Sequence, residues 1–216
     1  MGTNLEICLL TDKESSDVFP QMYRTMLKNG WSYDMECGYH YYIDAPVWKF
    51  GDSVSSKVES CLGENGLDVA AKIGCFFTPI MRLSKQYDNY KTNSTIQIAE
   101  GEGEWKIAKF FIKLSDFAEH KQATSENIEE IKTLFFDLVD AINPSFALCG
   151  IEMLGMPESI DEIRICDESF GDFTYLPSNL IDGSTISSLS SDIFYTTNLD
   201  HGVIWTRKRH CLEVQT

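Results

Sequence analysis

The chain has 216 residues, of which 43% are hydrophobic and 12% aromatic, so it can bury a core and is not expected to be disordered. Its formal net charge of −15 attracts cationic partners and repels phosphate backbones, which argues against nucleic-acid binding. No apolar stretch approaches the roughly 18 residues that a membrane-spanning helix needs, so no membrane segment is expected.

Most of the negative charge lies in one segment. Residues 114–204 contain seventeen acidic and three basic residues, a net charge of −14. Residues 1–113 carry a net charge of −3, and residues 205–216 carry +2. This concentration predicts an acidic surface that meets a basic protein partner.

The N-terminus has no basic region and only a short apolar run, so it does not resemble a signal peptide. The seven cysteines are scattered, odd in number and never spaced as CxxC. In a reducing compartment such cysteines behave as small hydrophobic residues. We therefore expect a cytoplasmic protein without a disulfide framework.

The first 63 residues are predicted to form strands and helices in alternation. Apolar residues alternate over 4–11, which is typical of a strand. A helix follows, with Ser16 as its N-terminal cap and Gly30 as its left-handed C-terminal cap. The aromatic segment 38–50 predicts one or two strands, and the stripe of apolar residues over 53–63 predicts a short helix.

The middle of the chain predicts mainly strands. The nearly continuous apolar run 67–78 favours a buried strand. The polar stretch 84–94 predicts a loop, and it is the one plausible domain boundary. The β-rich runs 95–100 and 105–114 flank the sequence Gly-Glu-Gly-Glu, which indicates a hairpin.

The strongest predicted element is an amphipathic helix over 125–142, whose apolar residues recur at helical spacing. The strands predicted after it lie at 146–154, 161–166, 170–176, 193–198 and 202–207. Strands outnumber helices and hairpins outnumber βαβ units. The sequence therefore predicts one α+β domain over residues 1–216, with a mainly antiparallel or mixed sheet and two or three helices packed on one face.

Five acidic residues crowd two adjacent predicted strands. They are Asp161, Glu162, Asp167, Glu168 and Asp172. Two carboxylates at the right separation could hydrolyse a glycosidic bond, and several could bind Ca²⁺ or Mg²⁺. Acids at alternate strand positions usually point to water. We therefore interpret the five residues as a solvated face and as candidate partner-binding residues.

Aromatic residues form a second candidate partner-binding group. Tyr39 and Tyr41 share one face of the predicted strand at 38–50, and Trp48 follows near its end. Tyrosine and tryptophan are enriched at interaction hot spots, although they also fill cores.

No metal or cofactor is expected, because the four histidines are not spaced as ligands and no glycine-rich phosphate loop is present. Cys37, Cys75 or Cys149 could act as a nucleophile beside a histidine. Because Cys75 and Cys149 lie in apolar predicted strands, we interpret them as buried structural residues.

The C-terminal part resembles a known group of proteins. A long amphipathic helix is followed by INPSFALCGIEML, FGDFTYLPSNLI and DHGVIW. This order, within residues 125–206, is similar to the C-terminal half of uncharacterised prokaryotic proteins grouped with immunity proteins of polymorphic toxin systems. The resemblance implies that the protein neutralises a cognate toxin by binding it, without catalysis, and it assigns a role to no individual residue.

Together these observations predict a non-catalytic acidic binding protein, of the immunity type, that neutralises a basic protein partner. The alternative hypothesis is an enzyme that uses the clustered carboxylates in a pocket near the aromatic strand. A third hypothesis is a structural or oligomeric module, which would present a flat apolar surface.

Overall fold

The computed structural model describes residues 4–34, 39–43, 56–60, 65–76, 78–88, 90–113, 125–151, 156–166, 168–181, 189 and 191–208. Within these residues, eleven strands form one sheet and three α-helices pack against it. Each pair of neighbouring strands is antiparallel. The predicted α+β class, with its antiparallel sheet, is confirmed.

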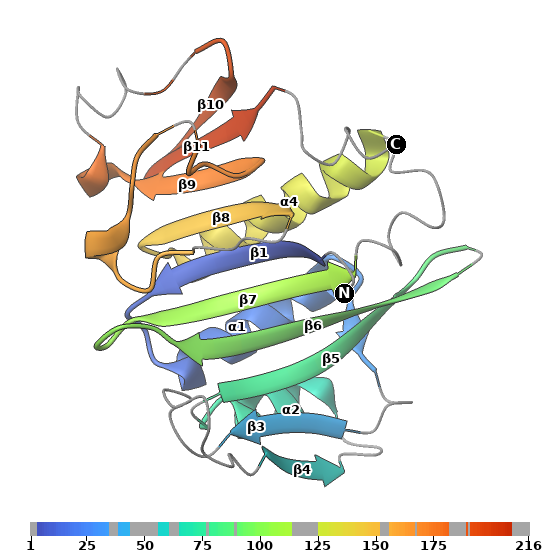
Figure 1. Cartoon of the computed structure of the whole chain (residues 1–216). Coiled ribbons are helices and arrows are strands. Elements are labelled where there is room, and N and C mark those ends of the chain that lie inside the picture. The colour runs from blue at the N-terminus through green and yellow to red at the C-terminus, as the bar shows by residue number, and fades with distance from the viewer. Residues whose placement is uncertain are drawn as a thin grey trace.

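The strands are β1 (Asn4–Thr11), β2 (Ser32–Tyr33), β3 (Tyr39–Ile43), β4 (Ser56–Ser60), β5 (Thr78–Gln86), β6 (Lys91–Glu100), β7 (Lys106–Lys113), β8 (Phe146–Ile151), β9 (Phe173–Pro177), β10 (Phe194–Leu199) and β11 (Gly202–Arg207). Their spatial order is β10-β11-β9-β8-β1-β7-β6-β5-β3-β4, and β2 pairs with β5 (Figure 1). The N-terminal strand therefore lies in the middle of the sheet.

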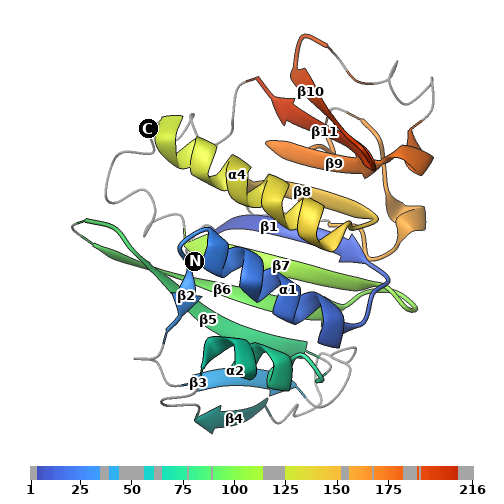
Figure 2. The same cartoon turned by 180° about the vertical axis from the view of Figure 1, so that it is seen from behind.

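All three helices cover the same face of the sheet (Figure 2). They are α1 (Ser15–Lys28), α2 (Gly66–Ile73) and α4 (Ser125–Ile142). The apolar stripe of α1, which includes Phe19 and Met22, and that of α4, which includes Phe135 and Leu138, are fully buried in one core cluster. The amphipathic pattern of each helix thus fixes the side that it turns toward the sheet.

A second core lies on the opposite face of the sheet. In β1, Leu5, Ile7 and Leu9 belong to the helix-side core, whereas Cys8 and Leu10 belong to the second core. The two cores alternate along the strand because successive side chains of a strand point to opposite faces. The second core explains why β1 is apolar on both faces.

Two predicted elements are exchanged in type. Residues 56–60 of the predicted helix form strand β4, and most of the predicted strand 67–78 forms α2. A short apolar run fits a helix as well as a strand. In α2, the Asn65 side chain accepts a hydrogen bond of 2.9 Å from the Leu67 N–H and caps the helix. Val69, Ala70 and Ile73 then form its buried side.

Three further predictions need correction. The segment 84–94 is not a loop, because β5 and β6 run through most of it and pair as a hairpin. The segment 161–166 does not form a strand; the 3-10 helix η1 (Ile160–Glu162) begins it. Helix α1 begins at Ser15 with Glu14 as its N-cap, so Ser16 is not the cap. The left-handed Gly30 is confirmed, with a φ angle of 82°.

Candidate partner-binding site

Between β8 and β9, the described residues 156–166 and 168–172 cross the face of the sheet that holds the second core. Met156 and Phe170 are buried in this core, and Ile163 and Ile165 pack against it. Glu162, Arg164 and Cys166, which alternate with these isoleucines, are exposed. The alternation that predicted a strand is therefore present, but the segment lies on the sheet and does not pair within it.

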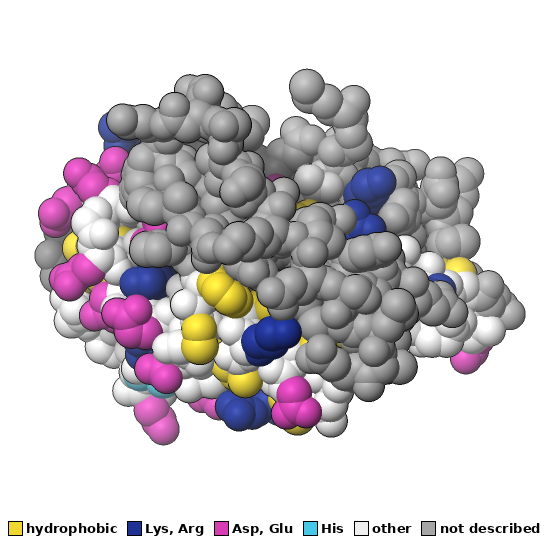
Figure 3. All heavy atoms as spheres, turned by 90° about the horizontal axis from the view of Figure 1, so that it is seen from below, with side chains coloured by type: hydrophobic (Ala, Val, Ile, Leu, Met, Phe, Trp, Pro, Cys, Tyr) yellow, Lys and Arg dark blue, Asp and Glu magenta, His cyan; other side chains and the backbone are white. Residues whose placement is uncertain are grey.

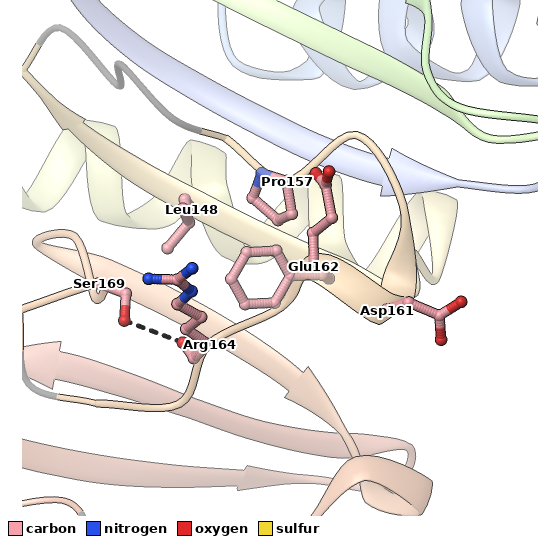
Figure 4. Close-up of a pocket in the computed structure, with 7 residues that line it drawn as sticks. Leu148, Pro157, Asp161, Glu162, Arg164 and Ser169 are labelled. Atoms are coloured by element: carbon pink, nitrogen blue, oxygen red, sulfur yellow. Dashed lines mark hydrogen bonds between the residues drawn. The ribbon is translucent and has the colours of Figure 1, made fainter.

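This segment encloses a cavity of about 530 Å³ against strand β8. Its lining combines an apolar wall with charged and polar residues: Phe146, Leu148, Pro157, Asp161, Glu162, Arg164 and Ser169. In Figure 4 the Arg164 side chain extends toward Leu148, whereas the Asp161 carboxylate points away from it. The Ser169 hydroxyl donates a hydrogen bond of 2.9 Å to the Arg164 carbonyl oxygen and holds the segment closed.

The two neighbouring carboxylates of η1 have different surroundings. The Glu162 carboxylate accepts a hydrogen bond of 2.8 Å from the Glu158 backbone N–H, which fixes the turn before η1. The Asp161 side chain is exposed and has no ion-pair partner among the described residues. Asp161 is therefore available to another molecule.

The hairpin turn between β6 and β7 adds further acids to this place. The Glu102 N–H donates a hydrogen bond of 2.9 Å to the Glu158 carbonyl oxygen. We call the resulting group the acidic cluster; its members are Glu102, Glu104, Glu158, Asp161 and Glu162. All five side chains are exposed. Figure 3 views the molecule from the β4 end and shows most of its visible carboxylates along one side, with lysine or arginine side chains among them.

The sequence predicted only part of this cluster. Asp161 and Glu162 belong to it, and Glu168 is exposed farther along the same segment. Asp172 is not on the solvated face, because its residue is only 1% exposed and its backbone pairs with Cys149 and Arg207. Asp167 lies outside the described residues. Glu102 and Glu104 were missed because only the long-range contact with Glu158 brings them here.

The acidic residues of 114–204 do not form one surface. In helix α4, the Asp137 carboxylate pairs with Lys28 at 3.0 Å, and Glu130 pairs with Lys85 at 2.8 Å. Both pairs lie on the helix side of the sheet, opposite the acidic cluster. The expectation of a single acidic face is therefore corrected to a smaller group of carboxylates.

The aromatic candidates lie far from these carboxylates. Tyr39 and Tyr41 belong to β3, which is separated from β8 by β1, β7, β6 and β5. Five steps of roughly 4.8 Å each separate β8 from β3 by about 24 Å. Trp48 lies outside the described residues. One pocket formed by the aromatic strand and the 161–172 acids, as the alternative hypothesis required, is thus not present among the described residues.

The described cysteines differ in environment. Cys8 and Cys149 are buried, and burial raises the pKa of both thiols, that of Cys8 to about 12. Cys75 is exposed two residues after the end of α2, contrary to the prediction of a buried strand residue. Cys166 is also exposed, and the hydrogen bond with the Ser169 hydroxyl lowers its pKa.

Neither a metal site nor a membrane-spanning helix is found in the part of the chain that the structure describes. No group of three or more His, Cys, Asp or Glu side chains there could hold a metal ion. No described helix combines the length and the hydropathy needed to cross a bilayer.

No protein-family model matches the chain, and no curated protein matches it. Among solved structures, the fold is similar to that of the Pseudomonas aeruginosa T6SS protein PA0821, with a TM-score of 0.54 and 10% sequence identity. The similarity covers 95% of this chain and 66% of that chain. At this level of identity the comparison shows a shared fold.

Proposed function

We propose that this protein is a non-catalytic binding protein of the immunity type, and that its acidic cluster meets a basic surface of a protein partner. The observation that carries the proposal is the position of Glu102, Glu104, Glu158 and Asp161. Two segments that lie more than fifty residues apart in the chain bring these exposed carboxylates to one place.

The negative charge of the acidic cluster favours a basic partner. Like charges that gather on a surface repel one another, and the repulsion is relieved when cationic groups bind. A partner with lysine or arginine side chains would gain in association rate from the field of the cluster and of the whole chain, whose net charge is −15. The acids paired on α4 contribute less, because Lys28 and Lys85 already compensate them.

The cavity beside the cluster supplies the other part of an interface. Protein interfaces combine an apolar centre with a polar rim. Here Phe146, Leu148 and Pro157 offer the apolar wall, while Arg164 and the acids surround it. A side chain of the partner that enters this cavity would fix the orientation of the partner on this surface, which the charges alone do not determine. Tyr39 and Tyr41, on strand β3 toward the other end of the sheet, remain candidate contacts of a larger partner, and so does Trp48.

The likeness in fold to a T6SS protein and the resemblance of residues 125–206 to immunity proteins both fit this role. The test begins with the protein that the immobilised chain retains from its source cells. The dissociation constant of the purified pair is then measured at low and high ionic strength, for the wild type and for Glu104→Gln/Asp161→Asn. Binding should weaken with salt, and less steeply for the variant. An affinity that is equal in all four measurements would reject the proposal.

A further inference from the structure

Strand β10 is an edge of the sheet within the described residues (Figure 1). Its sequence is FYTTNL, and the four side chains from Tyr195 to Asn198 are exposed, that of Tyr195 to 62%. An open edge presents unpaired N–H and C=O groups to other strands, and proteins usually block it with charges or proline. Strand β10 has neither, whereas the opposite edge strand β4 contains Lys57 and Glu59.

The hairpin geometry determines which backbone groups of β10 face outward. Leu199 pairs with Gly202 across the two-residue turn, so these two residues exchange hydrogen bonds. Hydrogen-bonded and non-hydrogen-bonded pairs then alternate along the hairpin. Thr197, paired with Ile204, therefore directs its N–H and C=O toward β11. Thr196 and Asn198 direct theirs outward.

We propose that two copies of this chain associate through an antiparallel pairing of their β10 strands. A two-fold axis perpendicular to the joined sheet preserves the face on which each side chain lies. Because opposed residues of antiparallel strands share a face, one residue must then oppose its own copy. The central registers place either Thr196 opposite Thr196 or Thr197 opposite Thr197.

Charge selects between these two registers. With Thr196 at the axis, Asp200 would oppose Asp192 of the second copy, and opposed like charges destabilise a strand pair. With Thr197 at the axis, Asp200 opposes Phe194 of the second copy. Arg207 lies over the Phe194 ring at 5.0 Å, and Lys208 lies over Tyr195 at 4.9 Å.

The second register therefore brings Asp200 of each copy toward the end of the other β10 strand, where Arg207 and Lys208 outnumber Asp192. Symmetry repeats this favourable contact, so it occurs twice in the dimer. This charge complementarity is the reason for assigning the edge to a second copy. The long-range repulsion between two copies of net charge −15 is screened within about 8 Å at physiological ionic strength.

Cysteine cross-linking tests the register. In the proposed dimer, the two Thr197 residues form a non-hydrogen-bonded pair with Cα atoms about 4.5 Å apart, a distance that a disulfide can span. Thr197→Cys should therefore give an intermolecular disulfide under mild oxidation. Thr196→Cys is the matched control, because Thr196 opposes Asn198 of the second copy. Both variants carry Cys75→Ser and Cys166→Ser, and the parent with these two changes gives the background.

The oligomeric state of the unmodified protein is measured by sedimentation velocity over a range of concentrations. We expect the wild type to show a monomer–dimer equilibrium, and the disulfide-linked dimer to be several-fold more abundant for Thr197→Cys than for Thr196→Cys. Thr196→Pro should be a monomer, because proline at this position blocks the outward edge of β10 without removing a hydrogen bond to β11. A wild type that stays monomeric at every concentration would overturn the proposal. Cross-linking that is equal for the two cysteine variants would do the same.

Discussion

The backbone N–H of Glu102 donates a hydrogen bond to the carbonyl oxygen of Glu158 at 2.9 Å. This contact joins the β6–β7 turn to the segment that crosses the second core. It places the side chains of both glutamates in the same exposed region, together with Glu104, Asp161 and Glu162. The acidic cluster is thus a product of tertiary structure, since neither segment contains it alone.

Removing charge from the acidic cluster should stabilise the isolated protein. The carboxylates of Glu104 and Asp161 are exposed and gain no ion pair among the described residues. Glu104→Gln/Asp161→Asn removes two of the negative charges that the acidic cluster gathers on a chain of net charge −15. At low salt we expect the melting temperature to rise slightly and the free energy of unfolding to increase by up to about 0.5 kcal/mol. Both increases should vanish at high salt. A decrease in stability would mean that these carboxylates make favourable interactions within the protein.

Gly101 permits the close approach of the two acidic segments. A Cβ atom at this position would lie 2.5 Å from the Glu158 carbonyl oxygen and 3.0 Å from that of Trp105. Gly101→Ala should therefore destabilise the protein by about 1–3 kcal/mol, as measured by urea unfolding. It should also increase hydrogen exchange in residues 156–166.

Gly103 gives the matched control for that substitution. It lies two residues away with a φ angle of 65°, and nothing lies within 4 Å of a Cβ atom added there. Asparagine tolerates this left-handed conformation, so Gly103→Asn should leave exchange in 156–166 unchanged. If both variants behaved alike, the contact with Glu158 would not be the cause.

Phe170 anchors the end of the segment that contributes Glu158, Asp161 and Glu162 to the acidic cluster. Its ring makes edge contacts with Phe194 and Trp205, each at a centroid distance of 5.7 Å, and the residue is 3% exposed. Phe170→Ala should lower the free energy of unfolding by about 3–5 kcal/mol. It should also weaken partner binding without any change in charge. The conservative Phe170→Leu should retain most of both properties, and full binding by the alanine variant would contradict the anchoring role.

Alkaline pH should destabilise the protein through its buried thiol and hydroxyl groups. Burial raises the pKa of Cys8 from 9.0 to about 12 and that of Tyr175 from 10.0 to about 12. A group whose pKa is higher in the folded than in the unfolded state contributes its full stabilisation at pH values below the pKa of the unfolded state. This contribution is lost as the pH rises toward the pKa of the folded state. The free energy of unfolding should therefore fall between about pH 9 and pH 12. Cys8→Ala should make the fall less steep, and an unchanged slope would exclude Cys8 as a contributor.

The elements with long or regular patterns could be predicted from the sequence. The strand at β1, the helix α4 and the β6–β7 and β10–β11 hairpins follow from apolar periodicity and turn residues. α2 and β4 were exchanged in type. Each is short, and the period of a run of eight residues or fewer does not separate a helix from a strand.

The candidate site was only partly predictable, for a physical reason. Asp161 and Glu162 stood out as local acids, whereas Glu102 and Glu104 join them through a contact across more than fifty residues. Asp172 has the same local pattern as its neighbours but is buried, since β9 begins directly after it. Charge counted along the chain therefore did not indicate which carboxylates share a surface.

The most direct test of a basic partner is the salt dependence of its affinity, measured for the wild type and for Glu102→Gln/Glu104→Gln/Asp161→Asn. These substitutions leave the hydrogen bond of the Glu162 carboxylate in place. We predict that the dissociation constant of the wild-type complex rises with ionic strength, and that the triple variant binds more weakly at low salt and responds less to salt. Equal affinity and an equal salt response for the two proteins would contradict the assignment of the acidic cluster as the binding surface.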